Sequence, residues 1–351
     1  MQEVPASLIQ GSKPVLGTFN GPVKSLDIRG LRAPFGGVPL PSFVTNFRIK
    51  STLTFSFNTG DYFCSIIFYD GKAFGLAEID LWNNSTGRKY VYKSLMGPRR
   101  RFIPHNLEQG FCASFNSRRY IRISWDHTRD RFSVIFNIKG DSVRPSIQAA
   151  LTGHLNDSRT AEITQCIPII SKRRCAASYF ATPVMKGTLS ITPSKKGETI
   201  SENVENASSI FFINRAYHSY IQKSQLIYGT GMVDGKHVSF IIENSPEQIP
   251  DPEVCNRNLL IVDGQCTPLP PVKMTQPFGL DEKWIIQDYD NMVDLTWQPV
   301  AMHTRNFNLF INKIRMDILF GKFEGVLKTK DGADINIDGL AGVGREQMMR
   351  V

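Results

Sequence analysis

The amino-acid sequence predicts an all-β fold made of two tandem antiparallel β-barrels. Three observations support this prediction. Apolar and polar residues alternate over short stretches, which is the two-residue period of strands with one wet face. Turn clusters rich in Asn, Asp and Gly separate these stretches, and no helical period lies between them. Strands repeated in this way form meanders, whose exposed edges are usually removed by closure into a barrel or a sandwich.

The clearest hairpin lies near the end of the chain. Residues 322–328 alternate between charged and apolar or small side chains, and residues 334–338 resume the alternation. Between them, Asp331-Gly332 supplies the positive φ angles that a tight hairpin turn needs. The stretch therefore predicts two short strands joined by a turn.

The same alternation divides the chain into two halves. Strand and turn signals follow one another from about residue 46 to residue 140, loosen over residues 141–185 with hints of a short helix, and then return. We place the joint between two domains in the loosened stretch. The sequence thus predicts an N-terminal extended segment over residues 1–40, a first barrel over 41–165 and a second barrel over 166–351.

Composition indicates a globular protein of the cytoplasm. The 351 residues are 41% hydrophobic, and no stretch approaches the run of about 20 apolar residues that a membrane helix needs. The first residues have neither the basic head nor the apolar core of a secretory signal. The six cysteines form no C-x-x-C motif, and several lie in apolar stretches, so we expect free thiols in a reducing compartment.

The chain is basic, with a formal net charge of +9. Short basic clusters keep a large surface soluble, and they also attract anionic membranes or nucleic acid. An anionic membrane surface is accordingly a candidate partner. The residues expected to contact it are Arg99, Arg100, Arg101, Lys172, Arg173 and Arg174.

Several ordered segments carry a resemblance to a known family. In the second half these are VDGKHVSFII, NLLIVDGQ, MVDLTWQPV and the closing GLAGVGRE; in the first half they are FRIKSTLTFSFNTGDYF and FGLAEIDLWNNSTG. Together they resemble the domain of unknown function 2804 family, from about residue 30 to the end. That family is similar in turn to the double-barrel, lipocalin-like superfamily, which includes carotenoid 1,2-hydratases. The resemblance implies two lipocalin-like (calycin-like) barrels that can enclose an apolar small molecule. It implies no single activity, because the relatives include both enzymes and carriers.

The chain departs from the family pattern at several points, and one of them replaces a carboxylate by a cation. The family tends to carry a Glu-Asn pair before its VDG turn, where this chain has Arg257 and Asn258. No G-x-S-x-G or H-E-x-x-H motif is present, and the six histidines are too widely spaced to suggest a zinc site. We therefore predict neither a metal nor a cofactor, and leave the catalytic residues unassigned.

A mixed apolar and polar group offers the best candidate for a ligand site. Barrel sites are apolar cavities in which a few polar groups orient the ligand. Suitable residues lie on one predicted hairpin around residues 217–228 and on another around residues 294–303. The predicted ligand-binding residues are Tyr217, His218, Tyr228, Asn258, Asp294, Trp297 and His303.

Three functions stay open at this point. The first is a binder or carrier of an apolar molecule such as a lipid or isoprenoid. The second is a lyase or isomerase in which His218 or His303, beside an acidic or phenolic neighbour, transfers a proton. The third and least favoured is nucleic-acid binding, which needs basic and aromatic residues on one groove or sheet face. The pairs Arg101-Phe102 and Arg119-Tyr120 are the only support for it that we find in the sequence.

Overall fold

The structure is a computed structural model of the whole chain. It describes residues 1–31, 34–35, 38–39, 41–72, 74–97, 102–169, 171–194, 197–217, 221–244, 255–309 and 312–350. Almost all regular structure in this part is β. The single helix is α1 (Ser42–Phe47), and none of the described helical residues forms a segment long and apolar enough to cross a membrane.

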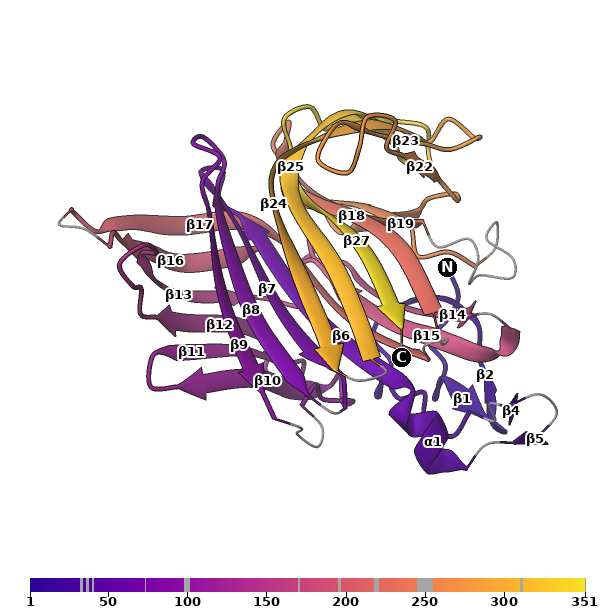
Figure 1. Cartoon of the computed structure of the whole chain (residues 1–351). Helices are drawn as coiled ribbons and strands as arrows, with labels where there is room; N and C mark the ends of the chain where they lie inside the picture. The colour runs from indigo at the N-terminus through magenta and orange to yellow at the C-terminus, as the bar shows by residue number, and fades with distance from the viewer. Residues whose placement is uncertain are drawn as a thin grey trace.

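The strands follow one another in the order of the chain (Figure 1). They are β1 (Ile9–Gln10), β2 (Lys13–Pro14), β3 (Gly17–Asn20), β4 (Pro34–Phe35), β5 (Val38–Pro39), β6 (Ile49–Asn58), β7 (Tyr62–Asp70), β8 (Gly75–Asn83), β9 (Lys89–Met96), β10 (Gln109–Asn116), β11 (Arg119–Asp126), β12 (Arg131–Ile138), β13 (Ser146–Gly153), β14 (Glu162–Ile169), β15 (Ser171–Ala181), β16 (Met185–Thr192), β17 (Ile200–Tyr217), β18 (Ile221–Val233), β19 (Lys236–Asn244), β20 (Leu259–Val262), β21 (Gln265–Pro268), β22 (Lys273–Thr275), β23 (Trp284–Gln287), β24 (Val293–Leu309), β25 (Asn312–Lys328), β26 (Asp334–Asn336) and β27 (Ala341–Arg350).

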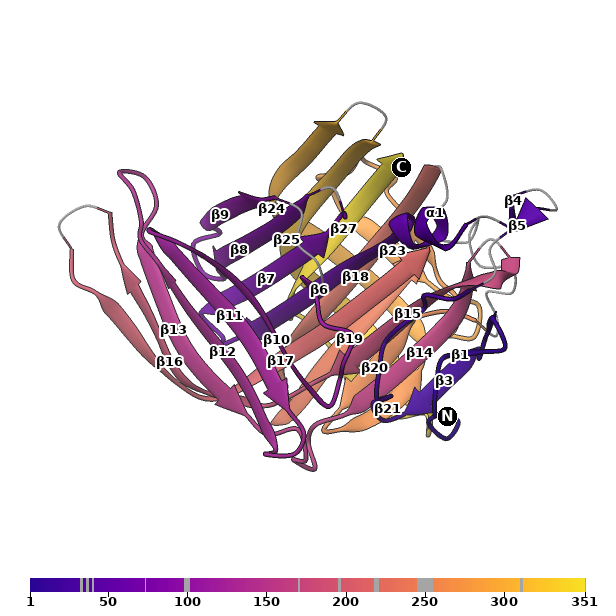
Figure 2. The same ribbon diagram turned by 90° about the horizontal axis from the view of Figure 1, so that it is seen from below.

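The first sheet curls into a nearly closed barrel (Figures 1 and 2). Its strands run in the order β10-β11-β12-β13-β16-β17-β6-β7-β8-β9. Strand β17 is 18 residues long and has different neighbours along its length. Its first part pairs with β16, and its second part lies between β15 and β6. Inward-facing residues such as Phe55, Ile123 and Phe211 fill the barrel with one continuous apolar core.

The second sheet forms a half-barrel that packs against the first. Its order is β21-β20-β19-β18-β27-β25-β24-β23-β22, and every pair is antiparallel. The concave side holds a core that includes Trp284 and Trp297. The two tandem barrel units that the sequence predicts are thus present, the first nearly closed and the second half open.

The two sheets meet through an apolar layer. Phe320 of β25 lies 6.3 Å from the ring of Phe63 and 6.1 Å from that of Trp82, between ring centroids. Tyr228 of β18 packs edge-on against Phe212 at 5.6 Å. This layer places the outer faces of β6, β7 and β8 against β18, β24, β25 and β27, and the candidate site lies within it.

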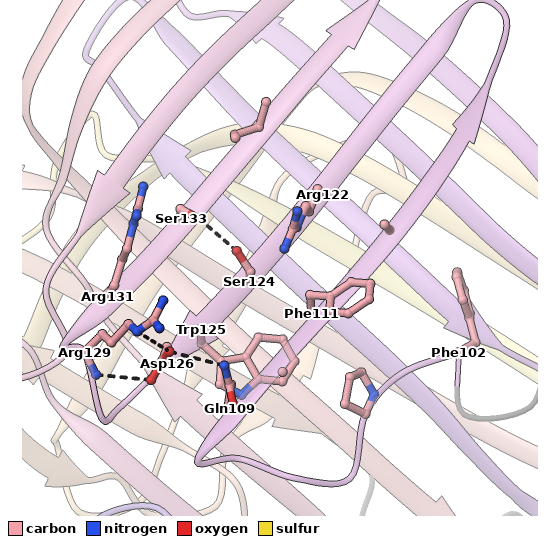
Figure 3. A pocket seen from close by; sticks show the side chains of 14 residues that line it. Phe102, Gln109, Phe111, Arg122, Ser124, Trp125, Asp126, Arg129, Arg131 and Ser133 are labelled. Atoms are coloured by element: carbon pink, nitrogen blue, oxygen red, sulfur yellow. Dashed lines mark hydrogen bonds and ion pairs between the residues drawn. The ribbon is translucent and has the colours of Figure 1, made fainter.

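On another side of the barrel, the outer face of β10, β11 and β12 is uncovered. The inward residues of these strands are buried, whereas Phe111 is 58% exposed on the outward face. Figure 3 shows the side chains that line a pocket here, among them Phe111 and Arg122 on neighbouring strands.

The predicted terminal hairpin is confirmed. Strands β25 and β26 join through Asp331-Gly332, and Gly332 has a φ of 85°. The hint of a short helix over residues 141–185 is wrong, because this stretch forms β13, β14 and β15. In β13 every second residue, including Ile147, Ala149 and Leu151, points into the barrel. Burial of these side chains in the core stabilises the strand over a helix.

The change from one sheet to the other comes after Tyr217. The expected joint near residue 165 falls inside β14, which belongs to the first sheet. Within the expected N-terminal segment, β3 pairs with β14, and Phe19 joins the core of the first barrel. The division of the chain into domains stays a prediction.

Candidate functional site

Two carboxylates face the second sheet from strand β8. Glu78 and Asp80 are two positions apart, so both side chains point to the outer face of the barrel. Neither has any exposed surface. Opposite them, His303 and Arg305 of β24 are also two positions apart and face the first sheet. Packing two apolar sheets together therefore buries two acids against two basic groups.

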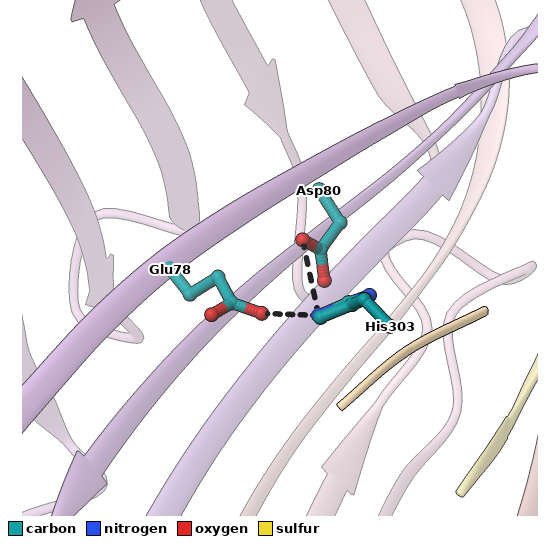
Figure 4. Close-up of side chains that lie close together, drawn as sticks. All are labelled: Glu78, Asp80 and His303. Atoms are coloured by element: carbon teal, nitrogen blue, oxygen red, sulfur yellow. Dashed lines mark hydrogen bonds and ion pairs between the residues drawn. The ribbon is translucent and has the colours of Figure 1, made fainter. Parts of the chain in front are cut away.

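The histidine bridges the two carboxylates (Figure 4). His303 Nε2 lies 3.0 Å from Glu78 Oε1 and 3.8 Å from Asp80 Oδ1. Arg305 donates from Nε to the same Glu78 oxygen at 2.7 Å, makes a second, shorter contact through Nη2, and lies 3.9 Å from Asp80 Oδ2. Charge-assisted bonds of this kind hold the side chains of both strands in one geometry.

The pKa values of the two carboxyl groups are shifted in opposite directions. Burial raises the pKa of Glu78, but the hydrogen bond of His303 and the charge of Arg305 outweigh it and lower the pKa to about 2. Burial and then the negative charge of Glu78 raise the pKa of Asp80 well above its ordinary value. Two carboxylates this close cannot both ionise cheaply. Of the two groups, Asp80 is thus the one that holds its proton more tightly, beside an ionised Glu78.

His303 is neutral at the same pH. Burial lowers its pKa, although Glu78 works in the opposite direction. A neutral ring that donates from Nε2 to Glu78 carries its lone pair on Nδ1. Figure 4 shows that the second ring nitrogen points away from the carboxylates. Nδ1 is buried, and among the described residues it has no hydrogen-bond partner. Leaving such an atom without a partner costs about 1–3 kcal/mol. Asp80 Oδ1, Asp80 Oδ2 and Glu78 Oε2 of the same cluster are also buried without a hydrogen-bond partner among the described residues.

A partly open surface borders this cluster. The outward residues of β9 are Lys89, Val91, Lys93 and Leu95, which we call the β9 ledge. In the register of the sheet, Lys93 lies opposite Glu78, and Val91 lies opposite Asp80. The second sheet covers β8 but leaves much of the ledge free, since Leu95 is 65% exposed and the Lys93 side chain 41%. The ledge offers two apolar and two cationic side chains beside the buried acids.

Lys89 has an altered acidity on this ledge. Burial lowers its pKa to about 8, against the attraction of Asp80 and Glu78. Its ammonium group lies 5.7 Å from the centre of the Phe320 ring, at the edge of the apolar layer. A lysine with this pKa can stabilise developing negative charge or exchange a proton near neutral pH.

The cluster also has the ligand types of a metal site. Glu78, Asp80 and His303 each offer a ligand atom within 4.8 Å of the others. However, the guanidinium of Arg305 is bonded to the Glu78 oxygen that faces His303. A divalent cation would have to displace Arg305, while Arg305, Lys89 and the proton on Asp80 already balance the acids. The arrangement fits proton chemistry better than metal binding.

A second polar group lies in the same layer. Tyr228 Oη is 3.0 Å from Ser65 Oγ and 3.3 Å from Ser56 Oγ, which ties β18 to the first sheet. Arg257 and Glu243 form an ion pair at 2.5 Å. Arg345 lines two small cavities in the layer, of about 40 Å³ and about 10 Å³, the second shared with Arg305. Both cavities are too small for a ligand of more than a few atoms.

The predicted ligand-binding residues are spread over several environments. Tyr228 and His303 lie in the layer between the sheets. Tyr217 is buried at the end of β17 beneath Arg48 and Arg174, and Trp297 packs in the half-barrel 5.1 Å from Trp284. The remaining predicted residues are Asn258, which clamps a loop through Glu243 N and Pro270 O; Asp294, which accepts from Gln287 on the surface; and His218, which lies outside the described residues.

Sequence reasoning missed most of the cluster. His303 was predicted, whereas Glu78, Asp80 and Arg305 were not. A signal was available: FGLAEIDLW places two acids on one strand face, and HTR places two basic groups on another. Matching the two i, i+2 pairs by charge would have suggested that the faces meet.

The predicted membrane contacts stay a prediction. Arg99, Arg100 and Arg101 lie outside the described residues, as do the side chains of Lys172 and Arg173. Arg174 is described, and its guanidinium lies 4.9 Å from the centre of the Tyr217 ring.

The chain is similar in fold to several proteins of known structure. Among solved structures it is similar to CghA (TM-score 0.48, 11% identity, 85% of this chain and 87% of that one). It is also similar to kievitone hydratase from Nectria haematococca (TM-score 0.43, 8% identity, 86% of this chain and 88% of that one). A third similar structure is a putative ATTH from Nitrosomonas europaea (TM-score 0.41, 10% identity, 91% of this chain and 100% of that one). Among curated proteins none matches the sequence. The family model described as domain of unknown function (DUF2804) matches residues 8–351, and the chain belongs to that family.

Proposed function

We propose that the protein binds an apolar small molecule on the β9 ledge and catalyses a proton transfer on it, as a lyase or isomerase does. The observation that carries this proposal is the buried group of Glu78, Asp80 and His303 at the inner edge of the ledge. Ionisable groups with opposed pKa shifts in a partly open site are candidates for acid and base roles.

His303 would be the base. Its Nδ1 takes a proton from a carbon next to a carbonyl, and the ionised Glu78 stabilises the imidazolium that forms at Nε2. The electron pair moves toward the carbonyl oxygen, where Lys89 or Lys93 balances the developing charge. In an isomerisation the imidazolium returns the proton to another carbon; in an elimination the electron pair forms the C=C bond, the C–O bond breaks, and the leaving hydroxide takes the proton of the imidazolium and departs as water.

Asp80 would be a positioning residue behind His303. As the acid that holds its proton, it keeps one negative charge, not two, beneath the histidine. Since Nδ1 is buried, a ligand must displace neighbouring side chains to reach it. Lys89 and Lys93 are long and flexible enough for such a displacement.

Native mass spectrometry of gently purified protein is the first test. We expect an adduct of small-molecule mass, which then serves as the probe. Its protons are followed by NMR in D₂O with the wild type and with His303→Gln. The variant is expected to keep the adduct and to lose proton exchange by about 100-fold or more.

His154→Gln is the matched control, because His154 pairs with Asp130 on the surface and its side chain is 55% exposed. It should leave exchange unchanged. If the wild type binds the molecule but does not exchange its protons, the result would contradict catalysis and support a carrier function. Unchanged exchange in His303→Gln would remove His303 as the base, and no adduct after incubation with apolar carbonyl compounds would contradict binding itself.

A further inference from the structure

A groove of about 790 Å³ crosses the outer face of strands β10, β11 and β12 (Figure 3). Its walls include Phe111, Arg122, Ser124, Arg131, Ser133 and Ile135. It lies on the outer wall of the first barrel and shares no lining residue with the layer that holds the buried acids.

The outward residues of the groove are not needed for the core. Their neighbours along the strands, Cys112, Ile123 and Val134, point inward and fill the barrel. Phe111 is nevertheless 58% exposed, and Ile135 is 41% exposed. Large apolar side chains gathered on one exposed face mark an interaction site more often than chance exposure does.

The aromatic side chains continue past the groove on the same face. Phe115 of β10 and Tyr120 of β11 are opposite one another in the sheet register. They are 65% and 37% exposed, respectively. With Phe111, three rings are thus offered to solvent on two neighbouring strands, in the manner of a stacking platform.

The face is also positively charged. The lining of the groove includes three arginines, Arg122, Arg129 and Arg131, and one aspartate, Asp126. The Arg122 guanidinium lies 5.1 Å from the centre of the Phe111 ring, so a cation and an aromatic surface are presented together. Anionic partners are favoured by this charge.

Polar groups inside the groove narrow the choice of partner. Ser124 Oγ and Ser133 Oγ form a hydrogen bond of 2.8 Å on its floor, and Gln109 donates to Asp126 at 3.3 Å. These groups keep further lone pairs and an N–H group that the apolar part of a bilayer would leave without partners, and a flat bilayer surface does not follow a hollow. A chain of phosphates and bases supplies both hydrogen bonds and ring faces.

We infer that this groove binds single-stranded nucleic acid. Arginines along the face would contact phosphates, and Phe111, Phe115 and Tyr120 would stack on unpaired bases. A duplex is disfavoured because its bases are already stacked and paired. This binding is independent of the proton-transfer proposal.

The test is fluorescence anisotropy of the full chain with a labelled oligothymidylate or oligouridylate of about 15 nucleotides. We expect saturable binding that weakens steeply as salt rises from about 50 to about 200 mM. Phe111→Ala is expected to weaken binding by about 5-fold or more, since one stacked base is lost. Arg122→Gln should weaken binding and also flatten the salt dependence.

Matched controls exist elsewhere on the surface. Phe278 is 74% exposed, and the Arg315 side chain is 63% exposed beside Asp317. Phe278→Ala and Arg315→Gln should bind like the wild type. Thermal unfolding checks that all variants fold, which is expected because the groove residues are exposed.

Two results would overturn the inference. One is the absence of binding at low salt, or binding that Phe111→Ala and Arg122→Gln leave unchanged. The other is Phe111-dependent and Arg122-dependent binding to vesicles of phosphatidylcholine and phosphatidylserine without binding to either oligonucleotide. The second result would assign the groove to an anionic membrane.

Discussion

Asp80 carries the clearest consequence at the scale of single residues. It is fully buried next to an ionised Glu78, and its pKa is raised by burial and by that neighbour. The folded protein therefore holds a proton that the unfolded chain releases above about pH 4. The contribution of Asp80 to stability is complete below that pH and is lost as the pH rises.

Replacing Asp80 by Asn removes this loss. We expect Asp80→Asn to gain stability relative to the wild type between pH 4.5 and pH 8, with a slope of at most about 1.4 kcal/mol per pH unit. Urea unfolding at several pH values measures it. Asp334→Asn is the control, because the Asp334 side chain is 66% exposed. A stability difference for Asp80→Asn that does not grow with pH would contradict a protonated Asp80.

Arg305 stabilises the fold, because its positive charge compensates the buried negative charge of Glu78. Arg305→Met would leave a buried carboxylate without its cation, which is expected to cost about 3–5 kcal/mol in urea unfolding. Adding Glu78→Gln should recover part of that loss, because the uncompensated charge is then gone. Lys283→Met breaks only a surface pair with Glu324, whose side chain is 64% exposed, and should cost less than about 1 kcal/mol. An equal loss in both single variants would contradict this account.

At this scale the sequence predicted His303 but not the residues around it. The alternation in FGLAEIDLW predicts a strand, and it also predicts that the two acids lie on a face exposed to solvent. In the structure both faces of β8 are buried, one by the barrel core and one by the second sheet. The second face of β8 is buried because another sheet packs on it, and the alternation of residues along one strand cannot predict that contact.

Strands β24 and β27 show how elements are fitted together on the concave side of the half-barrel. Gly344 of β27 has no side chain and so leaves space for the Trp297 ring, because a Cβ atom on Gly344 would lie 2.3 Å from Trp297 Cη2. Trp297 in turn packs against Trp284 and Phe323. The glycine is required by the indole and not by a special backbone angle.

We expect Gly344→Ala to destabilise the half-barrel by about 1–3 kcal/mol, as overpacking of a core does. Thermal unfolding monitored by tryptophan fluorescence reports it, with a changed native spectrum as Trp297 shifts. Gly97→Ala is the matched control, since no atom lies within 4 Å of a Cβ there. A neutral Gly344→Ala with an unchanged spectrum would mean that the ring is packed differently.

Elements with strong turn chemistry were predictable, and those shaped by neighbours were not. The Asp331-Gly332 hairpin follows from its residues alone. The stretch 141–185 lacked clean alternation because β14 is buried on nearly every residue, as its burial pattern shows. Such strands read as apolar runs, which a short helix also produces.

At the scale of the whole molecule, the two sheets depend on one another. Each contributes large apolar side chains, such as Trp82 and Phe320, to a layer that either sheet alone would expose to water. The free energy gained by burying this area, roughly 25 cal/mol per Å², belongs to both sheets together. Their unfolding should therefore be coupled.

We expect one cooperative unfolding transition in urea. Trp125 reports on the barrel and Trp284 on the half-barrel, so single-tryptophan variants with the other three replaced by Phe follow each sheet separately. The two fluorescence curves and far-UV circular dichroism should share one midpoint. Separate midpoints would show that the layer does not couple the sheets.

The change of sheet after Tyr217 has a practical consequence for gene design. A cut between Tyr217 and Ile221 leaves β17 and β18 whole and divides neither sheet, whereas a cut near residue 165 would remove β15, β16 and β17 from the barrel wall. Two fragments made this way each carry one side of the apolar layer, with Glu78 on one fragment and Arg305 on the other. They are suited to serve as a split protein, in which neither fragment holds the whole cluster and reassembly brings its two sides together again.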